Sequence, residues 1–322
     1  MTEKRPVLVA TEADDPTADR VITHLNQRDV PVVRFNLADI GDGLTVSARY
    51  GTRSAHTAGR VLTLLTPSRA ARLDDVRAVY WRRPTWPTFP HLGPDDARFA
   101  AAQTRHGLGG VLHGLDGLLW VNHPARNAEA DYKPHQLGLA QRLGLAVPPT
   151  LITNDPPEAR EFVAAHPKVI YKTLRLTSYQ RDGVRLAPWA EPVSADEIDD
   201  RVRVAPHLFQ VCIDKTCDVR VLIVGRHVFA VRIKSDLLDW RRDYSALTYS
   251  VVTLPAPLET ALFAFLDVFG LASGSFDLAV DRDGAHWFLE LNPNGQWGWL
   301  EECSGLPMAA AFADLLARGE TP

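Results

Sequence analysis

Three oxygen-bearing side chains near the end of the chain have types and a spacing that suit metal binding. Glu290 and Asn292 are two positions apart in an apolar run, so they lie on one face of a predicted strand. The preceding apolar run carries Asp277, and the polar turn 281–284 between the runs predicts a β-hairpin. Asp277 can therefore reach the same face. Two carboxylates and an amide are hard oxygen ligands, which suit Mg²⁺ that is shared with nucleotide phosphates.

A solvated strand face is the alternative interpretation of these residues, since carboxylates are usually exposed. Against it, Glu290 lies between Leu289 and Leu291 in a run that otherwise has core character. A bare charge buried in such a run would be costly. We therefore predict that Asp277, Glu290 and Asn292 bind a magnesium ion.

The elements that position these residues begin with an α/β pattern. Apolar runs near 6–10 and 30–35 predict strands, and the apolar spacing between them predicts a helix, as in a parallel α/β unit. Segments 45–50 and 60–65 can form a hairpin. No GxGxxG follows the first strand, so the dinucleotide-binding fingerprint is absent. We place the end of this first domain near residue 124.

Further along, helix and strand signals alternate with polar segments. We predict one helix over 127–143, a strand over 169–172 and a polar loop over 173–186. These and the later signals divide the chain into three parts. Their ranges are 1–124, 125–207 and 208–322.

Composition excludes several classes of protein. The 322 residues carry a formal net charge of −4, which gives no reason to expect nucleic acid or an anionic membrane as a partner. No apolar run reaches the roughly 20 residues that span a bilayer, and the N-terminus lacks a signal-peptide pattern. Cys212, Cys217 and Cys303 lack zinc-site or redox spacing, so we expect reduced thiols in a cytoplasmic protein.

The order of the polar residues is typical of one family. Lys133, Lys172 and Arg220 precede the triad Asp277, Glu290 and Asn292. From about 120 to 310 the chain resembles an ATP-grasp ligase. The resemblance implies two α+β subdomains, 125–207 and 208–322, that clamp ATP. The expected fold class is thus α/β and α+β, an ATP-grasp fold behind an N-terminal α/β (pre-ATP-grasp) domain.

One branch of that family is more similar than the others, the microviridin-type (graspetide) peptide maturases. The segments that carry this resemblance are Tyr80-Trp81-Arg82-Arg83-Pro84, Cys217-Asp218-Val219-Arg220-Val221, Asp239-Trp240-Arg241 and the NPxGQWxWxE string at 292–301. It implies that ATP activates Asp or Glu side chains of a ribosomal precursor peptide as acyl-phosphates. A Thr or Ser hydroxyl or a Lys amine of the same peptide then closes an ester or amide ring. A homodimer is also implied.

The resemblance also implies roles for individual residues. Lys133 and Lys172 would contact the α- and β-phosphates, with surface lysines as the alternative. Arg220 would stabilise charge near the γ-phosphate, with an Asp218–Arg220 surface pair as the alternative, and Arg241 is a weaker candidate for the same region. The adenine slot and the ribose or phosphate contacts would come from residues that could equally be ordinary strand and turn positions. These are Gln210, Val211, Ile213, Asp214 and Lys215.

Three features leave alternatives open. Arg82 and Arg83 could recognise a carboxylate-rich peptide or tie domains together. Trp297 and Trp299 could wall the site against water or serve in packing. Many ATP-grasp enzymes cover the phosphates with a glycine-rich loop. Either side-chain cations replace the backbone amides here, or the loop serves peptide binding, because 173–186 contains a single glycine and three arginines. These are Gly183, Arg175, Arg181 and Arg185.

Two other functions compete with the cyclase. An ATP-grasp ligase that joins a free amino acid to a peptide, carrier or small carboxylate would share every nucleotide residue, but it would need a compact acceptor site. A nucleotide-binding regulatory protein without turnover is the third hypothesis. The joint presence of Asp277, Glu290, Asn292 and Arg220 argues against it.

Overall fold

The N-terminal part is built on a parallel sheet. A computed structural model describes residues 5–51, 60–175, 179–181, 184–186 and 189–320. The sheet has the strand order β2-β1-β6-β7. One face packs against α1 and α8, and the other packs against α2 and a small antiparallel sheet, β3-β4-β5. The predicted 45–50/60–65 hairpin is confirmed. The bounds are β1 Val7–Thr11, α1 Pro16–Gln27, β2 Val32–Phe35, β3 Thr45–Tyr50, β4 Arg60–Leu65, β5 Ala70–Arg72, β6 Ala78–Arg83, α2 Pro94–His113 and β7 Leu119–Val121.

Two short helices, α3 (Pro124–Ala130) and α4 (Lys133–Arg142), replace the single helix predicted over 127–143. The prediction was wrong because Pro134 lacks the N–H that a continuous helix would direct to the Ala130 carbonyl, and its ring would clash there. The chain therefore starts a new helix, with Lys133 as its first residue.

A second, antiparallel sheet follows, with the order β12-β9-β13-β8. It packs against α5 through Ala159, Val163 and Phe209. Two short paired strands, β10 and β11, lie within the segment predicted to be a loop. The Asp182-Gly183 dipeptide between them is a hairpin signal that the loop prediction overlooked. The bounds are β8 Thr150–Thr153, α5 Pro156–Ala164, β9 Val169–Lys172, β10 Tyr179–Arg181, β11 Val184–Leu186, β12 Glu191–Val193 and β13 His207–Val211.

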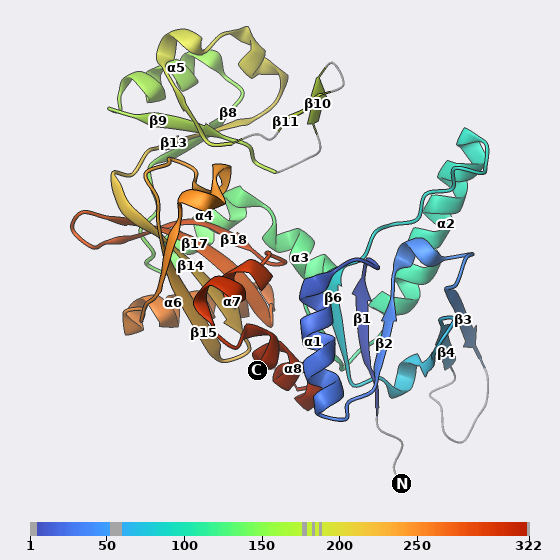
Figure 1. The fold of residues 1–322 in the computed structure, drawn as a ribbon. Coiled ribbons are helices and arrows are strands. Elements are labelled where there is room, and N and C mark those ends of the chain that lie inside the picture. The colour runs from blue at the N-terminus through green and yellow to red at the C-terminus, as the bar shows by residue number, and fades with distance from the viewer. Residues whose placement is uncertain (1–4, 52–59, 176–178, 182–183, 187–188, 321–322) are drawn as a thin grey trace.

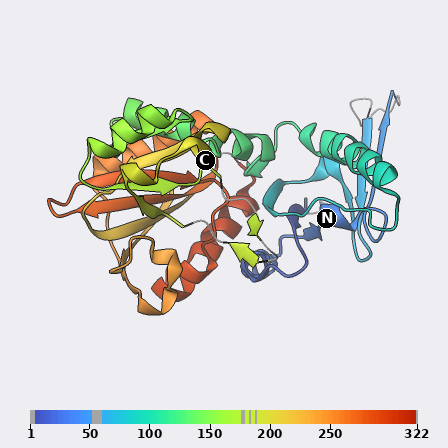
Figure 2. The same ribbon diagram turned by 90° about the horizontal axis from the view of Figure 1, so that it is seen from above.

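The third sheet is antiparallel, with the order β16-β15-β14-β17-β18. It lies below the second sheet in Figure 1, and the N-terminal part lies beside both; Figure 2 shows the same arrangement from above. The predicted hairpin that carries Asp277 and Glu290 is confirmed as β17 and β18. The bounds are β14 Lys215–Val224, β15 His227–Lys234, β16 Thr248–Val251, α6 Ala256–Phe269, β17 Ser273–Asp281, β18 His286–Asn292, α7 Gly298–Ser304 and α8 Met308–Arg318.

Side chains alternate between the two faces of β14, so the third sheet contributes both to the hydrophobic core and to the candidate site. Val219, Val221 and Ile223 belong to the core that α4 and α6 cover. On the opposite face, Leu222 and Val224 pack with α8 and the N-terminal sheet. Asp218 and Arg220 lie on that same opposite face but nearer the start of the strand. The first half of β14 therefore presents polar side chains toward the second sheet. In the described part of the chain, no helix is long and apolar enough to cross a membrane.

Candidate active site

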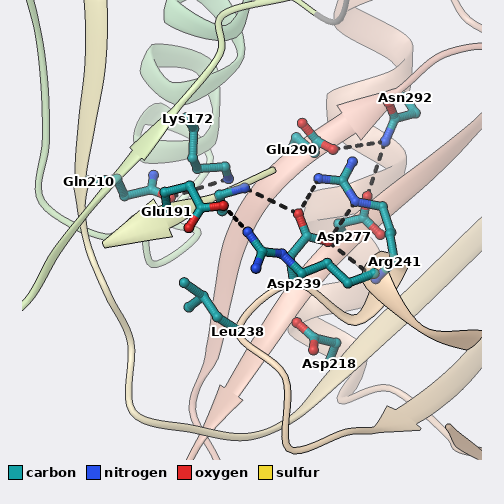
Figure 3. A network of polar contacts seen from close by, with 12 residues as sticks. Lys172, Glu191, Gln210, Asp218, Leu238, Asp239, Arg241, Asp277, Glu290 and Asn292 are labelled. Atoms are coloured by element: carbon teal, nitrogen blue, oxygen red, sulfur yellow. Dashed lines mark hydrogen bonds and ion pairs between the residues drawn. The ribbon is translucent and has the colours of Figure 1, made fainter. Parts of the chain in front are cut away.

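Asp277 and Glu290 form the centre of the candidate site (Figure 3). The strand register places Asp277 opposite Glu290 and Ser275 opposite Asn292, so the three predicted metal ligands share one face. The Nδ2 atom of Asn292 donates hydrogen bonds to Asp277 Oδ2 at 3.1 Å and to Glu290 Oε1 at 3.3 Å. The Asp277 and Glu290 side chains are 16% and 14% exposed, so the carboxylates are largely shielded from water.

Each carboxylate has a cationic partner from another element. Lys133 Nζ, at the start of α4, donates to Glu290 Oε2. Arg220 lies opposite Asp277 in the pairing of β14 with β17, and its Nη1 donates to Asp277 Oδ2 at 2.5 Å. Lys172 Nζ, at the end of β9, donates to Gln210 Oε1 at 3.5 Å. The structure thus brings the predicted lysines and Arg220 to the acidic centre.

The electrostatic balance at Glu290 favours its charged form. Burial alone raises the pKa of this carboxyl, but the ammonium groups of Lys133 and Lys172 more than offset burial and hold the pKa below its ordinary value. Burial lowers the pKa of Lys172, and Glu290 opposes that decrease. Burial raises the pKa of Asp277, with Arg220 acting against it. The centre therefore combines carboxylates with cationic side chains that could also contact a polyanion, such as a chain of phosphates.

A cleft between the second and third sheets adjoins the centre. It encloses about 680 Å³ of empty space, part of it open to solvent. Its walls include apolar side chains, such as Ile170, Leu238 and Leu289, beside Glu290. Most of the predicted nucleotide residues also line it. These are Lys172, Gln210, Val211, Ile213 and Lys215.

Asp214 is the exception among the predicted nucleotide residues. It does not line the cleft, and its carboxylate pairs with Arg282 at 2.6 Å, with both side chains about three-quarters exposed. Its neighbour Lys215 turns inward, where Nζ donates to Asp218 Oδ2 at 2.6 Å and to the Leu238 carbonyl at 2.9 Å. The two adjacent positions thus have different environments.

Asp218 and Arg220 are both buried, which excludes a surface ion pair between them. Asp218 accepts from Lys215, and Arg220 donates to Asp277. Burial raises the pKa of Asp218 to about 6, although Lys215 opposes this increase. Arg220 is therefore held by the acidic centre itself.

Arg241 is fixed by a carboxylate that sequence reasoning missed. Its Nε and Nη2 donate to the two oxygens of Asp239 at 2.8 and 2.7 Å, a bidentate pair. Asp239 also accepts from the Arg241 N–H at 3.2 Å, as the N-cap of a short 3₁₀ helix. An aspartate that precedes a turn is a capping signal that could have identified this role. The pair points Arg241 toward the cleft.

Two further hollows meet at the acidic centre. The outer hollow, with about 800 Å³ of empty space, lies beyond Asp277 and Asn292, and its lining includes Arg83, Asp131, Arg220, Arg241, Tyr244 and Trp299. The side hollow, with about 960 Å³, is lined by Asp131, Lys133, Lys172, Arg175 and Glu290, among others. Gly183 and the side chains of Arg181 and Arg185 lie outside the described part of the chain, so Arg175 alone of that group can be placed.

The structure separates the roles of Arg82 and Arg83. Arg82 is 1% exposed, and its guanidinium donates to Asn294 Oδ1 at 3.2 Å and to Gln296 Oε1. It thus ties the N-terminal sheet to the segment after β18. Arg83 lines the outer hollow instead.

The two tryptophans separate in the same way. Trp297 is buried and stacks on Phe312 with a centroid distance of 4.9 Å, which is a packing role. Trp299 packs on Trp240 and Tyr244 and lines the outer hollow.

Asn122 is a second polar residue that the sequence did not reveal. Its Oδ1 accepts from the Ala272 and Ser273 N–H groups at 2.9 and 3.1 Å. Its Nδ2 donates to the Ser273 and Pro293 carbonyls, each at 2.8 Å. Asn122 therefore fixes the start of β17 and the end of β18 from the N-terminal part. A single asparagine after a predicted strand carries no signal for such a contact.

The donor set fits a hard divalent cation. Two carboxylates and one amide converge, and the positive end of the Asn292 amide lies between the carboxylates, where positive charge is stabilised. Because amide orientation follows the hydrogen bonds, a bound cation would favour the flipped amide, with Oδ1 inward. Lys133 and Lys172 adjoin the same point and suit phosphate oxygens.

Solved structures show the same fold. The ATP-grasp ligase associated with RiPPs from Chryseobacterium gregarium, in complex with ADP and a leader and core peptide, is 26% identical with a TM-score of 0.89, and the match covers 99% of each chain. The macrocyclase MdnB from Microcystis aeruginosa MRC is 27% identical with a TM-score of 0.79, over 97% of this chain and 99% of that one. The ATP-grasp ligase PsnB, complexed with a minimal precursor, Mg and ADP, is 22% identical with a TM-score of 0.77 over 99% of each chain.

No model of a known protein family matches the chain, and no curated protein sequence does. The structural matches nevertheless extend over almost the whole chain. The chain has the fold of the ATP-grasp ligases, as the sequence predicted, and its resemblance to those that act on ribosomal peptides is confirmed.

Proposed function

We propose that the protein is an ATP-dependent ligase that closes rings in a ribosomally made precursor peptide. One observation carries this proposal: the acidic centre lies where the cleft, the side hollow and the outer hollow meet. A nucleotide in the cleft would direct its phosphates toward that centre, and a carboxyl group could approach from the outer hollow. Such an arrangement suits transfer of a phosphoryl group to a carboxylate.

In this proposal each part of the site has a distinct task. Gln210, Val211 and Ile213 contact the base, and Lys215 lies beside the sugar and phosphates. Lys133 and Lys172 contact the phosphate chain as point charges. Asp277, Glu290 and Asn292 would hold Mg²⁺, which neutralises charge on the phosphates when bound.

Catalysis would then rest on positioning and charge stabilisation, without a protein nucleophile. Arg220 and Arg241 stabilise the charge on the transferred phosphoryl group. The activated carboxyl of an Asp or Glu side chain is attacked by a Thr or Ser hydroxyl, or by a Lys amine, of the same peptide. The products are a macrocycle, ADP and phosphate.

The partner and the assembly belong to the same proposal. The structurally similar ligase from Chryseobacterium gregarium was solved with a leader and core peptide, and PsnB with a precursor, Mg and ADP. These complexes support a leader-bearing peptide as the partner of this chain. We further propose a cytoplasmic homodimer and a division into the parts 1–124, 125–207 and 208–322.

Co-expression with short peptides encoded next to the gene, followed by mass spectrometry, tests the function. Each ring removes one water, so the account predicts a peptide lighter by a whole number of waters. The Glu290→Gln variant should leave the peptide unmodified. A wild-type protein that releases ADP on addition of a free amino acid, with every such peptide unchanged, would contradict the cyclase and favour the amino-acid ligase.

A further inference from the structure

Asp131 is a carboxylate at the acidic centre to which the proposed reaction has so far given no task. It occupies the break between α3 and α4, and it lines both the outer hollow and the side hollow. Within the described part of the chain its carboxylate forms no hydrogen bond and no ion pair, whereas Asp277, Glu290 and Asp239 are all paired. The residue remains accessible to solvent in the hollows. A free carboxylate at this point can accept a proton.

The charges that line the outer hollow are otherwise paired, except for that of Arg83. Arg220 is paired with Asp277, and Arg241 is paired with Asp239. Arg83 lines the same hollow without an ion pair among the described residues. One carboxylate and one guanidinium group in this hollow are therefore available to groups of a substrate.

We propose that Asp131 is the general base that takes a proton from the attacking hydroxyl or amine group of the peptide. This inference rests on the proposed function and adds a catalytic residue to it. For a hydroxyl group, the oxygen forms a bond to the carbonyl carbon of the acyl-phosphate. The bond from that carbon to the phosphate oxygen breaks, and phosphate leaves with the electron pair. The hydroxyl proton passes to Asp131 and from there to solvent.

The surroundings of Asp131 support its role as a proton acceptor. Burial raises the pKa of its carboxyl, Arg175 and Lys133 oppose that increase, and Glu290 adds to it. A raised pKa makes this carboxylate a stronger proton acceptor than an ordinary aspartate, and its missing hydrogen bonds leave its oxygens available to a substrate.

The Asp131→Asn variant distinguishes a defect in nucleophilic attack on the acyl-phosphate from a defect in forming the acyl-phosphate. With a precursor peptide that the wild type modifies, this variant should close rings about 100-fold more slowly or worse. Hydroxylamine attacks acyl-phosphates without help from a protein base, so peptide hydroxamate should still form in its presence. Glu129→Gln, an equal change in charge on exposed α3, is the matched control and should close rings at the wild-type rate.

Two outcomes for the Asp131→Asn variant would overturn the inference. One is full ring-closing activity, and the other is an equal loss of rings and hydroxamate. A wild-type protein that gives neither rings nor hydroxamate would overturn the proposed function, and this inference with it.

Discussion

Asp277 and Glu290 face each other across β17 and β18 at a β-bulge. The next paired position joins Leu278 to Phe288, so Leu289 has no partner on β17. Phe288 and Leu291 both enter the core, although they are three residues apart, and Leu289 and Glu290 both line the cleft. The bulge therefore places an apolar side chain and a carboxylate side by side on the cleft face, where a base and its phosphates would meet.

Glu290→Gln tests the acidic centre. The change keeps the shape of the side chain but removes the charge, so we expect turnover to fall by roughly 100-fold or more. Lys133 and Lys172 lose their counter-ion, and the free energy of unfolding should fall by about 1–3 kcal/mol. ADP release and denaturant unfolding measure the two effects. Glu302→Gln on the exposed surface is the control; equal activity of both variants would show that Glu290 binds no essential ion.

Lys172→Met tests the contact with phosphate. The methionine fills similar space in the cleft but lacks the ammonium group, so the Kd for ATP should rise by about 10- to 100-fold, equivalent to about 1.4–2.8 kcal/mol. Lys168→Met, at an exposed position before the same strand, should leave the Kd unchanged. Equal affinities of both variants in equilibrium binding would remove Lys172 from the nucleotide site.

The variants Arg82→Met and Arg83→Met distinguish a buried, structural arginine from an arginine that lines the outer hollow. Loss of the buried Arg82 side chain removes the guanidinium group beside Asp15 and the donor to Asn294 Oδ1 and Gln296 Oε1. The free energy of unfolding should therefore fall by about 3–5 kcal/mol. Arg83→Met should change the free energy of unfolding by less than about 0.5 kcal/mol but weaken peptide binding. If Arg82→Met were as stable as the wild type, Arg82 would not stabilise the contact between the N-terminal sheet and the segment after β18.

Asp218 gives a prediction about pH. Its pKa is raised from 3.8 to about 6 in the folded protein, so the folded state holds its proton more tightly than the unfolded state. Its contribution to stability is present below pH 4 and is lost as the pH rises through 6, on the order of 3 kcal/mol in total. Asp218→Asn removes this term. The variant should therefore gain stability relative to wild type between pH 4 and pH 7, as measured by denaturant unfolding; a constant difference would contradict the raised pKa.

Much of this architecture could be predicted because it follows from local patterns. The turn 281–284 and its flanking apolar runs specify the hairpin, and the two-residue spacing of Glu290 and Asn292 specifies their common face. These features need no knowledge of distant contacts. Which cations accompany the acidic residues was implied instead by the resemblance to ATP-grasp ligases, which rests in part on the order of Lys133, Lys172 and Arg220 along the chain.

Other features depend on contacts that no local pattern encodes. Asn122 bonds to residues about 150 to 170 positions away, and the side-chain hydrogen bonds of Arg82 reach residues more than 200 positions away. The position of Asp131 depends on the helix break at Pro134, which apolar periodicity alone did not reveal. Strict alternation would have put Leu289 in the core, and the bulge reverses that placement.

Calorimetric titration of ADP into the protein, with and without Mg²⁺, tests the central claim most directly. The account predicts that Mg²⁺ strengthens nucleotide binding in the wild type and that this gain disappears in Glu290→Gln, while binding without the cation remains measurable in both. Equal affinity of the wild type with and without Mg²⁺ would contradict a cation held by Asp277, Glu290 and Asn292.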